Sequence, residues 1–134
     1  MKQGFVKVAS ATPGIRVADP VYNAQVICEQ AKEAAEHGAK IVVFPELCIT
    51  GYTCNDLFLQ ELLLEKAKEA LLTIAEETGQ LETLFLVGLP VDKDGRLYNV
   101  AAVLYRGRIL GMIPKKNIPM YAEFYAVSYT HLTL

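Results

Sequence analysis

Ile41-Val42-Val43-Phe44-Pro45-Glu46-Leu47 is the stretch that decides the fold. Its apolar, β-branched beginning predicts a strand that is buried on both faces. Pro45 cannot donate to a sheet ladder, so the strand is expected to end there. Glu46 would then stand just past the end of a rigid strand, where α/β proteins commonly build their sites. The alternative is an ordinary exposed loop glutamate, and the stretch alone leaves that alternative open.

The composition is that of a globular chain with the length of one domain. Of its 134 residues, 52% are hydrophobic and 21% are charged, and the formal net charge is -2. Such a chain can form a core and is not disordered. Its basic residues are scattered, so neither a nucleic acid nor a membrane surface is expected as a partner. No apolar run reaches the roughly 18 residues of a membrane helix, and the N-terminus lacks a signal-peptide core, so a cytoplasmic location is expected.

The three cysteines, Cys28, Cys48 and Cys54, do not suggest a disulfide framework or a zinc site. Their number is odd, and they lack the close-paired Cys/His spacing of structural zinc. Cys28 is expected to be a small core residue of a helix. Cys48 is expected to pack beside the strand end, and Cys54 to lie in a loop. No metal site is therefore predicted.

The segments around the central stretch predict a mixed α/β sheet with two helices. A strand, a helix and a second strand within about forty residues form a parallel crossover unit. The first strand is expected to be central, and the later strands to form antiparallel hairpins. The expected elements are strand 5–9, helix 20–37, strand 40–44, helix 55–78 and strands 83–89, 97–105 and 108–113, with turns at 92–95 and 106–107.

Both helices should cover one face of this sheet, which leaves the other face open. The strands are apolar nearly throughout, so the open face needs a cover. The chain has no further helical segment to supply one. A second sheet, a partner chain or sequence absent from this chain would each satisfy the requirement.

A second polar centre follows the last strand. Pro114 and Lys115 repeat the order of the opening stretch, because an apolar strand is again followed by a proline and a charged residue. If the two strands run in the same sense, Lys115 and Glu46 can meet at one edge of the sheet. In acyl transfer the carboxylate could take a proton from a nucleophile and the lysine could stabilise the oxyanion. A structural ion pair, or two unrelated loop residues, remains the alternative.

Several short motifs follow one another along the chain. They are Phe44-Pro45-Glu46-Leu47 with Thr50-Gly51-Tyr52, Asp56-Leu57-Phe58-Leu59-Gln60, Tyr98-Asn99 with Ala101 and Val103, Gly111 to Lys115, and Pro119 to Tyr125. In this order they resemble the nitrilase (carbon–nitrogen hydrolase) superfamily, and more narrowly the N-terminal glutaminase domain of glutamine-dependent NAD synthetases. The resemblance covers about residues 4 to 125.

The resemblance implies a fold, a catalytic triad and a substrate. The fold would be the first half of an α-β-β-α sandwich, and the triad would combine glutamate, lysine and cysteine. Glu46 matches the general base and Lys115 the catalytic lysine, with Lys116 a poorer match. Tyr121, and more weakly Tyr52, would help to bind glutamine. The released ammonia would serve a C-terminal synthetase domain that uses ATP and Mg to activate nicotinic acid adenine dinucleotide, and the full-length enzyme would be a homo-oligomer.

The departures from the family pattern shape the expectation for this chain. The family's nucleophilic cysteine lies beyond Tyr125, so residues 1–125 are expected to form a partial glutaminase domain without cofactor and without glutaminase activity alone. Residues 126–134 resemble translated sequencing-adapter sequence and are predicted to be a non-native tail, so His131 carries no mechanistic weight. Two alternatives stay open: a free-standing amidase or carbamoyl hydrolase, and a non-catalytic α/β interaction module that exposes an apolar sheet face.

Overall fold

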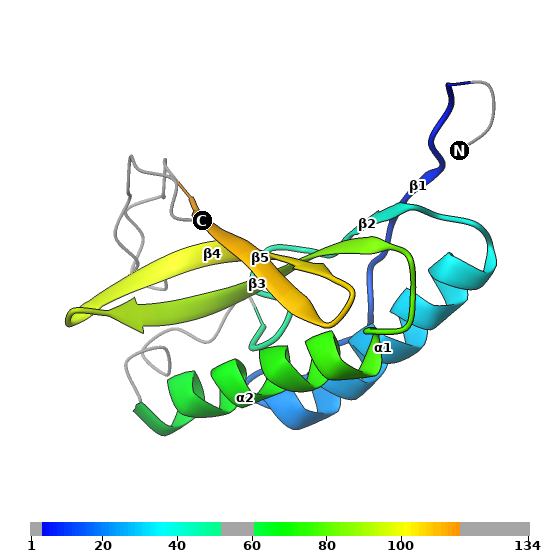
Figure 1. Ribbon diagram of the computed structural model, residues 1–134. Helices are drawn as coiled ribbons and strands as arrows, with labels where there is room; N and C mark the ends of the chain where they lie inside the picture. The colour runs from blue at the N-terminus through cyan, green and yellow to red at the C-terminus, as the bar shows by residue number, and fades with distance from the viewer. Residues whose placement is uncertain (1–3, 52–60, 116–134) are drawn as a thin grey trace.

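The computed structural model describes residues 4–51 and 61–115, which form a sheet with two helices (Figure 1). The sequence therefore predicts the fold class correctly. The elements are β1 (Val8–Ser10), α1 (Pro20–Glu36), β2 (Ile41–Val43), α2 (Glu61–Glu77), β3 (Leu84–Lys93), β4 (Arg96–Tyr105) and β5 (Arg108–Pro114). The beginning of the second helix expected at residues 55–60 lies outside the described residues.

The strands lie in the sheet in the same order as in the chain, β1-β2-β3-β4-β5. β1, β2 and β3 are parallel, whereas β4 and β5 each pair antiparallel with the preceding strand. Two reversals bring β5 back to the sense of β2, as convergence of Glu46 and Lys115 requires. The expectation of a central first strand is wrong, because β1 forms one edge of the sheet.

The first helix begins and ends where the sequence predicts. The Asp19 side chain accepts a hydrogen bond from the backbone N–H of Tyr22 at 3.2 Å, and Pro20 occupies the first helical position. The Asp19 side chain thus satisfies one of the free backbone amides at the start of the helix, and Pro20 has no amide N–H to satisfy. The helix ends at the His37 cap, and Gly38 follows with a φ of 86° that suits glycine. No helix in the described residues is long and apolar enough to span a bilayer.

The third strand is longer than expected, since it continues through Pro90 to Lys93 and leaves Asp94-Gly95 as the turn. Proline is tolerated here because β2 pairs with β3 only as far as Leu86, so Pro90 has no partner on that side. Asp94 and Gly95 both have positive φ, as do Arg106 and Gly107 in the next turn. Paired positive φ angles are typical of two-residue hairpin turns, so the predicted turn at 106–107 is confirmed and the one at 92–95 is shorter than expected.

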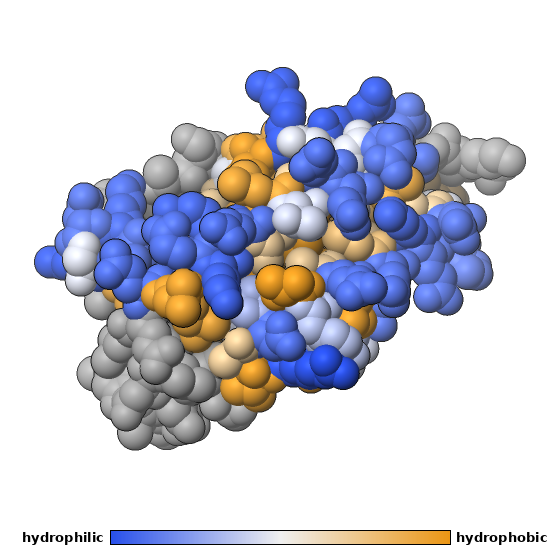
Figure 2. Space-filling view, turned by 90° about the horizontal axis from the view of Figure 1, so that it is seen from below, coloured by the Kyte–Doolittle hydropathy of each residue, from blue (hydrophilic) through white to orange (hydrophobic). Residues whose placement is uncertain are grey.

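Both helices cover the same face of the sheet, as Figure 1 shows below the strands. The core lies between these two layers and includes the fully buried side chains of Ile27, Val42, Ile74, Phe85 and Val87. Seen from the helical side, the surface is mostly hydrophilic with separate apolar spots (Figure 2). The inner face of α1 carries the small residues that the sequence predicts, Cys28 among them, and α1 packs closely against α2.

The opposite face of the sheet has no helix over it among the described residues. Side chains alternate along a strand, so Val43 and Ile113 point away from the buried Val42 and Ala102. They are 45% and 40% exposed, and Val8 on the same face is 62% exposed. β2 is therefore buried on one face only, which corrects the prediction of burial on both. The predicted open apolar face is present in the described part of the chain.

Asn23 of α1 connects this helix to the loop between β1 and α1 and to the loop after β2. It is fully buried; its side-chain nitrogen donates to the carbonyls of Arg16 (2.7 Å) and Ile49 (2.8 Å), and its oxygen accepts from the Arg16 N–H at 2.7 Å. An Asn23→Ala substitution would leave three backbone groups without this partner. We expect it to lower the free energy of unfolding by about 2–4 kcal/mol. Urea unfolding of the chain, followed by far-UV circular dichroism, measures this loss.

Thr73→Ala is the matched control for this prediction. Thr73 also bonds a backbone carbonyl, that of Glu69 at 3.1 Å, but it is exposed on α2. Water replaces such a bond and alanine favours a helix, so the control should change stability by about 0.5 kcal/mol or less. Equal effects of the two substitutions would contradict the role given to Asn23.

Candidate active site

The segment after β2 is held against β3 by backbone hydrogen bonds. The Phe44 N–H donates to the Leu86 carbonyl at 2.9 Å, and the Ile49 N–H donates to the Gly88 carbonyl at 3.1 Å. Between these two bonds, residues 45–48 pass directly over Gly88. A Cβ atom at position 88 would lie 2.4 Å from the Leu47 nitrogen and 2.7 Å from the Pro45 carbonyl oxygen. Only glycine permits this approach, which fixes where Glu46 emerges.

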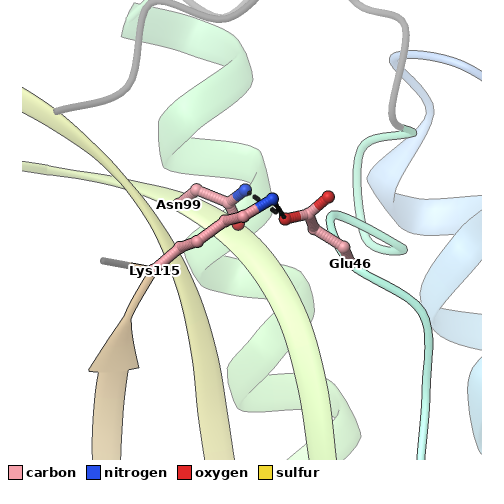
Figure 3. Close-up of polar contacts among 3 residues, drawn as sticks. All are labelled: Glu46, Asn99 and Lys115. Atoms are coloured by element: carbon pink, nitrogen blue, oxygen red, sulfur yellow. Dashed lines mark hydrogen bonds and ion pairs between the residues drawn. The ribbon is translucent and has the colours of Figure 1, made fainter. Parts of the chain in front are cut away.

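Glu46 meets a lysine and an asparagine from the far strands of the sheet (Figure 3). Lys115 Nζ lies 2.5 Å from Glu46 Oε1, and Asn99 Nδ2 donates to the same oxygen at 2.9 Å. The three side chains come from the loop after β2, from β4 and from the end of β5. Glu46 lies 53 positions before Asn99 and 69 positions before Lys115 in the sequence, and the sheet brings the three side chains together.

The backbone also aligns this group. The Lys115 N–H donates to the Asn99 carbonyl at 2.7 Å, which continues the β4–β5 ladder one step beyond β5. The Glu46 and Lys115 side chains are 30% and 34% exposed, so they are partly desolvated but still accessible. A carboxylate beside an ammonium in such a place can accept a proton from a neighbouring group, and the ammonium can stabilise a developing negative charge.

A hollow of about 360 Å³ lies over these side chains on the open face of the sheet. Its other walls are apolar and include Val43, Leu86 and Ile113. Glu46 and Lys115 are the ionisable side chains among the described residues that line it. A small, mostly apolar hollow with a few convergent polar groups has the general character of a ligand site.

The structure brings together Glu46 and Lys115, the two residues predicted to converge, so that prediction of placement is confirmed. Tyr52 and Tyr121, predicted to bind substrate, lie outside the described residues, as do Cys54, Lys116 and the predicted tail.

The cysteines of the described residues are poorly suited to act as nucleophiles. Cys48 is only two residues from Glu46, but it is 1% exposed and its Sγ points at the Gly88 carbonyl, 3.7 Å away. Burial raises the pKa of the Cys48 thiol to about 11. Burial, followed by a hydrogen bond to Glu77, raises the pKa of the Cys28 thiol to about 12. Both thiols are therefore protonated near neutral pH, whereas a nucleophilic cysteine reacts as the thiolate.

Asn99 is the site residue that sequence reasoning missed, because the Tyr98-Asn99 motif was assigned only to a strand. It is 4% exposed, and its side chain contacts Glu46. The available signal was a polar residue within the apolar strand Leu97–Tyr105. A buried asparagine needs hydrogen-bond partners, so it points to another polar group nearby. The partner could not be read from the sequence, since it lies 53 positions away.

Comparison with known proteins places this geometry in a family. The carbon–nitrogen hydrolase profile matches residues 7–130. The chain belongs to the carbon–nitrogen hydrolase family. Glutamine-dependent NAD(+) synthetase from Mycobacterium tuberculosis is 40% identical over 124 residues, which are 92% of this chain and 18% of that protein. This carbon–nitrogen hydrolase chain thus spans about a fifth of the length of the relative.

Solved structures agree with this assignment. A glutamine-dependent NAD(+) synthetase from Cytophaga hutchinsonii superposes with a TM-score of 0.86 at 27% identity, over 93% of this chain and 22% of that one. An amidase from Nesterenkonia sp. superposes with a TM-score of 0.80 over 98% of this chain and 51% of that one. The amidase is 23% identical, and this likeness shows the shared fold alone. The chain therefore has the nitrilase-type α/β fold that the sequence predicts.

Proposed function

We propose that this chain is part of the glutaminase domain of a glutamine-dependent NAD synthetase. The observation that carries the proposal is the 40% identity to such a synthetase over 92% of the chain. The Glu46–Lys115 pair supports it, because amide hydrolysis uses a base and a cation at one place. The similarity to the amidase is at the level of fold, so a free-standing amidase is the weaker reading.

In this proposal Glu46 is the general base and Lys115 stabilises the oxyanion. The nucleophilic cysteine is the one that the family places beyond Tyr125. Glu46 takes the proton of that thiol as its sulfur attacks the amide carbon of glutamine. The tetrahedral oxyanion forms next to Lys115 Nζ and collapses to a thioester, and Glu46 returns the proton to the departing ammonia. Water, deprotonated by Glu46, then attacks the thioester and releases glutamate, and the thiol recovers its proton.

The wider context of the reaction also belongs to the proposal. Tyr121, and more weakly Tyr52, would contact the glutamine substrate. A synthetase domain that uses ATP and Mg would consume the ammonia to convert nicotinic acid adenine dinucleotide to NAD. A homo-oligomeric enzyme is the form expected from the resemblance, and a cytoplasmic location is the one expected from the sequence.

A chimera tests the proposed function. The 124-residue segment of the Mycobacterium tuberculosis synthetase that aligns with this chain is replaced by the corresponding residues of this chain, so that the rest of the relative supplies the nucleophile and the synthetase. We expect the chimera to form NAD from glutamine at a rate within about tenfold of the parent, because the base and lysine are held in the same fold. The measurement compares NAD formation with glutamine and with ammonium chloride as the nitrogen source.

The ammonium reaction is the internal control, since it needs the synthetase but no glutaminase. A chimera that uses ammonium at the parental rate and releases no ammonia from glutamine would contradict the proposal. The unmodified 134-residue chain should release no ammonia from glutamine. Activity of that chain that survives both Cys48→Ala and Cys54→Ala would contradict the mechanism.

A further inference from the structure

We propose that Asn99 is a positioning residue that gives the two oxygens of Glu46 different roles. Asn99 holds Oε1, and Oε2 is left as the atom that accepts the proton of the nucleophile. The inference rests on the proposed function, in which Glu46 is the general base. It goes beyond that function by naming the reacting oxygen and the side chain that selects it.

Among the described residues, the side-chain donors that contact Glu46 both approach the same carboxylate oxygen. Lys115 Nζ and Asn99 Nδ2 both approach Oε1, at 2.5 and 2.9 Å. Each donor stabilises negative charge on the oxygen that it contacts, so Oε1 is the weaker proton acceptor of the two. The proton that the nucleophile gives up therefore goes to Oε2.

The amide of Asn99 suits this task because it cannot exchange protons with the carboxylate. Its Nδ2 is a neutral donor at any working pH, whereas Lys115 carries the charge needed elsewhere. When the ammonium of Lys115 turns toward the oxyanion, Asn99 still holds Oε1. The side chain of Glu46 then keeps its orientation through the step in which it loses its cationic partner.

Asn99 is itself held rigidly by the sheet. It lies within β4, is 4% exposed and is paired across the ladder with Pro90. Its carbonyl accepts the Lys115 N–H at 2.7 Å, so the backbones of Asn99 and Lys115 are linked directly. A donor on a central strand is more precisely placed than a donor on a loop, which is the property that a positioning residue needs.

Two nearly isosteric substitutions in the chimera test the proposal: Asn99→Leu removes the donor, and Asn99→Asp replaces it with a carboxyl group. We expect each to lower kcat with glutamine at pH 8 by about 10- to 100-fold, the effect of losing one hydrogen bond to a charged group. KM for glutamine and the rate of NAD formation from ammonium should stay within about threefold of the values for the chimera. In this proposal Asn99 acts on kcat through Glu46 and contacts neither glutamine nor the substrates of the synthetase domain.

The pH dependence of the activity of the two variants distinguishes a positioning role of Asn99 from a role in packing alone. When protonated, the introduced carboxyl can donate to Glu46 as the amide does, so the activity of the Asn99→Asp variant relative to the chimera should rise as the pH falls from 8 to 6. Lys115 is the other charged side chain at this hollow among the described residues, and it is present in both proteins. The relative activity of the Asn99→Leu variant should not change with pH.

Thr83→Val is the matched control. Thr83 also donates a buried hydrogen bond, to the Ala39 carbonyl at 2.9 Å, but at the opposite end of the parallel strands. It should lower the melting temperature and leave kcat with glutamine within about twofold, since it is remote from the reacting atoms. An Asn99→Leu variant with the kcat of the chimera, or an Asn99→Asp variant whose relative activity is independent of pH, would overturn the proposal. A loss of the ammonium reaction in the same variants would also overturn it. Failure of the parent chimera with glutamine instead refutes the proposed function itself.

Discussion

Glu46→Gln in the chimera should lower NAD formation from glutamine by about 10³-fold, the usual contribution of a general base, and leave the reaction with ammonium unchanged. The introduced glutamine side chain has nearly the same shape as that of glutamate, and its amide oxygen can still accept the hydrogen bond from Asn99. It cannot take a proton from a thiol, so the loss isolates proton transfer from packing. Steady-state rates with the two nitrogen sources measure the effect directly.

Glu82→Gln is the matched control, since it removes the acid of an exposed ion pair. Glu82 Oε1 lies 3.2 Å from Arg106, and the two side chains are 68% and 52% exposed. Exposed pairs contribute little, so this substitution should change neither rate by more than about twofold. If Glu46→Gln behaved like Glu82→Gln, the Glu46–Lys115 contact would be a structural ion pair, which is the alternative that the sequence left open.

The sequence predicted that Glu46 and Lys115 could meet because both residues follow the same local pattern. Glu46 and Lys115 each come directly after a proline that ends an apolar strand. Their convergence depended on whether β2 and β5 run in the same sense, and the sequence could support that by the number of hairpins between them. Local chemistry was therefore enough for two of the three side chains.

The remaining features depended on contacts that local patterns do not encode. From the sequence, Asn99 is interpreted only as a strand residue, because its partner Glu46 lies in the distant loop after β2. β1 was expected at the centre because of its apolar residues, yet apolar residues also suit an edge when one face of the sheet packs on helices. The prediction that β2 is buried on both faces failed at Val43 for a similar reason. A run of apolar residues does not show which face of the sheet lacks a cover in this chain.

Gly88→Ala in the chimera should lower both stability and glutamine use, although the glycine lies on β3 and contacts no substrate in the proposed mechanism. The added methyl group would lie 2.4 Å from the Leu47 nitrogen, and backbone atoms cannot rotate away as a side chain does. We expect the free energy of unfolding to fall by about 1–3 kcal/mol, as in other overpacked cores. We expect glutamine-dependent kcat to fall by about 100-fold, because a shift of about 1 Å misplaces Glu46. Thermal unfolding and steady-state rates measure the two effects.

Gly14→Ala is the control, since a Cβ at position 14 meets nothing within 4 Å. It should leave both quantities unchanged, and a Gly88→Ala variant that behaves in the same way would show that the loop after β2 tolerates the added methyl group.

The double variant Glu46→Gln, Gly88→Ala separates the effect of Gly88 on the rate from its effect on stability. In the proposed mechanism Gly88 affects catalysis only by placing Glu46 against Lys115 and Asn99. Once Glu46→Gln has removed the proposed base, adding Gly88→Ala should therefore lower the glutamine rate little more. The stability losses should still add, because the steric clash does not depend on the carboxylate.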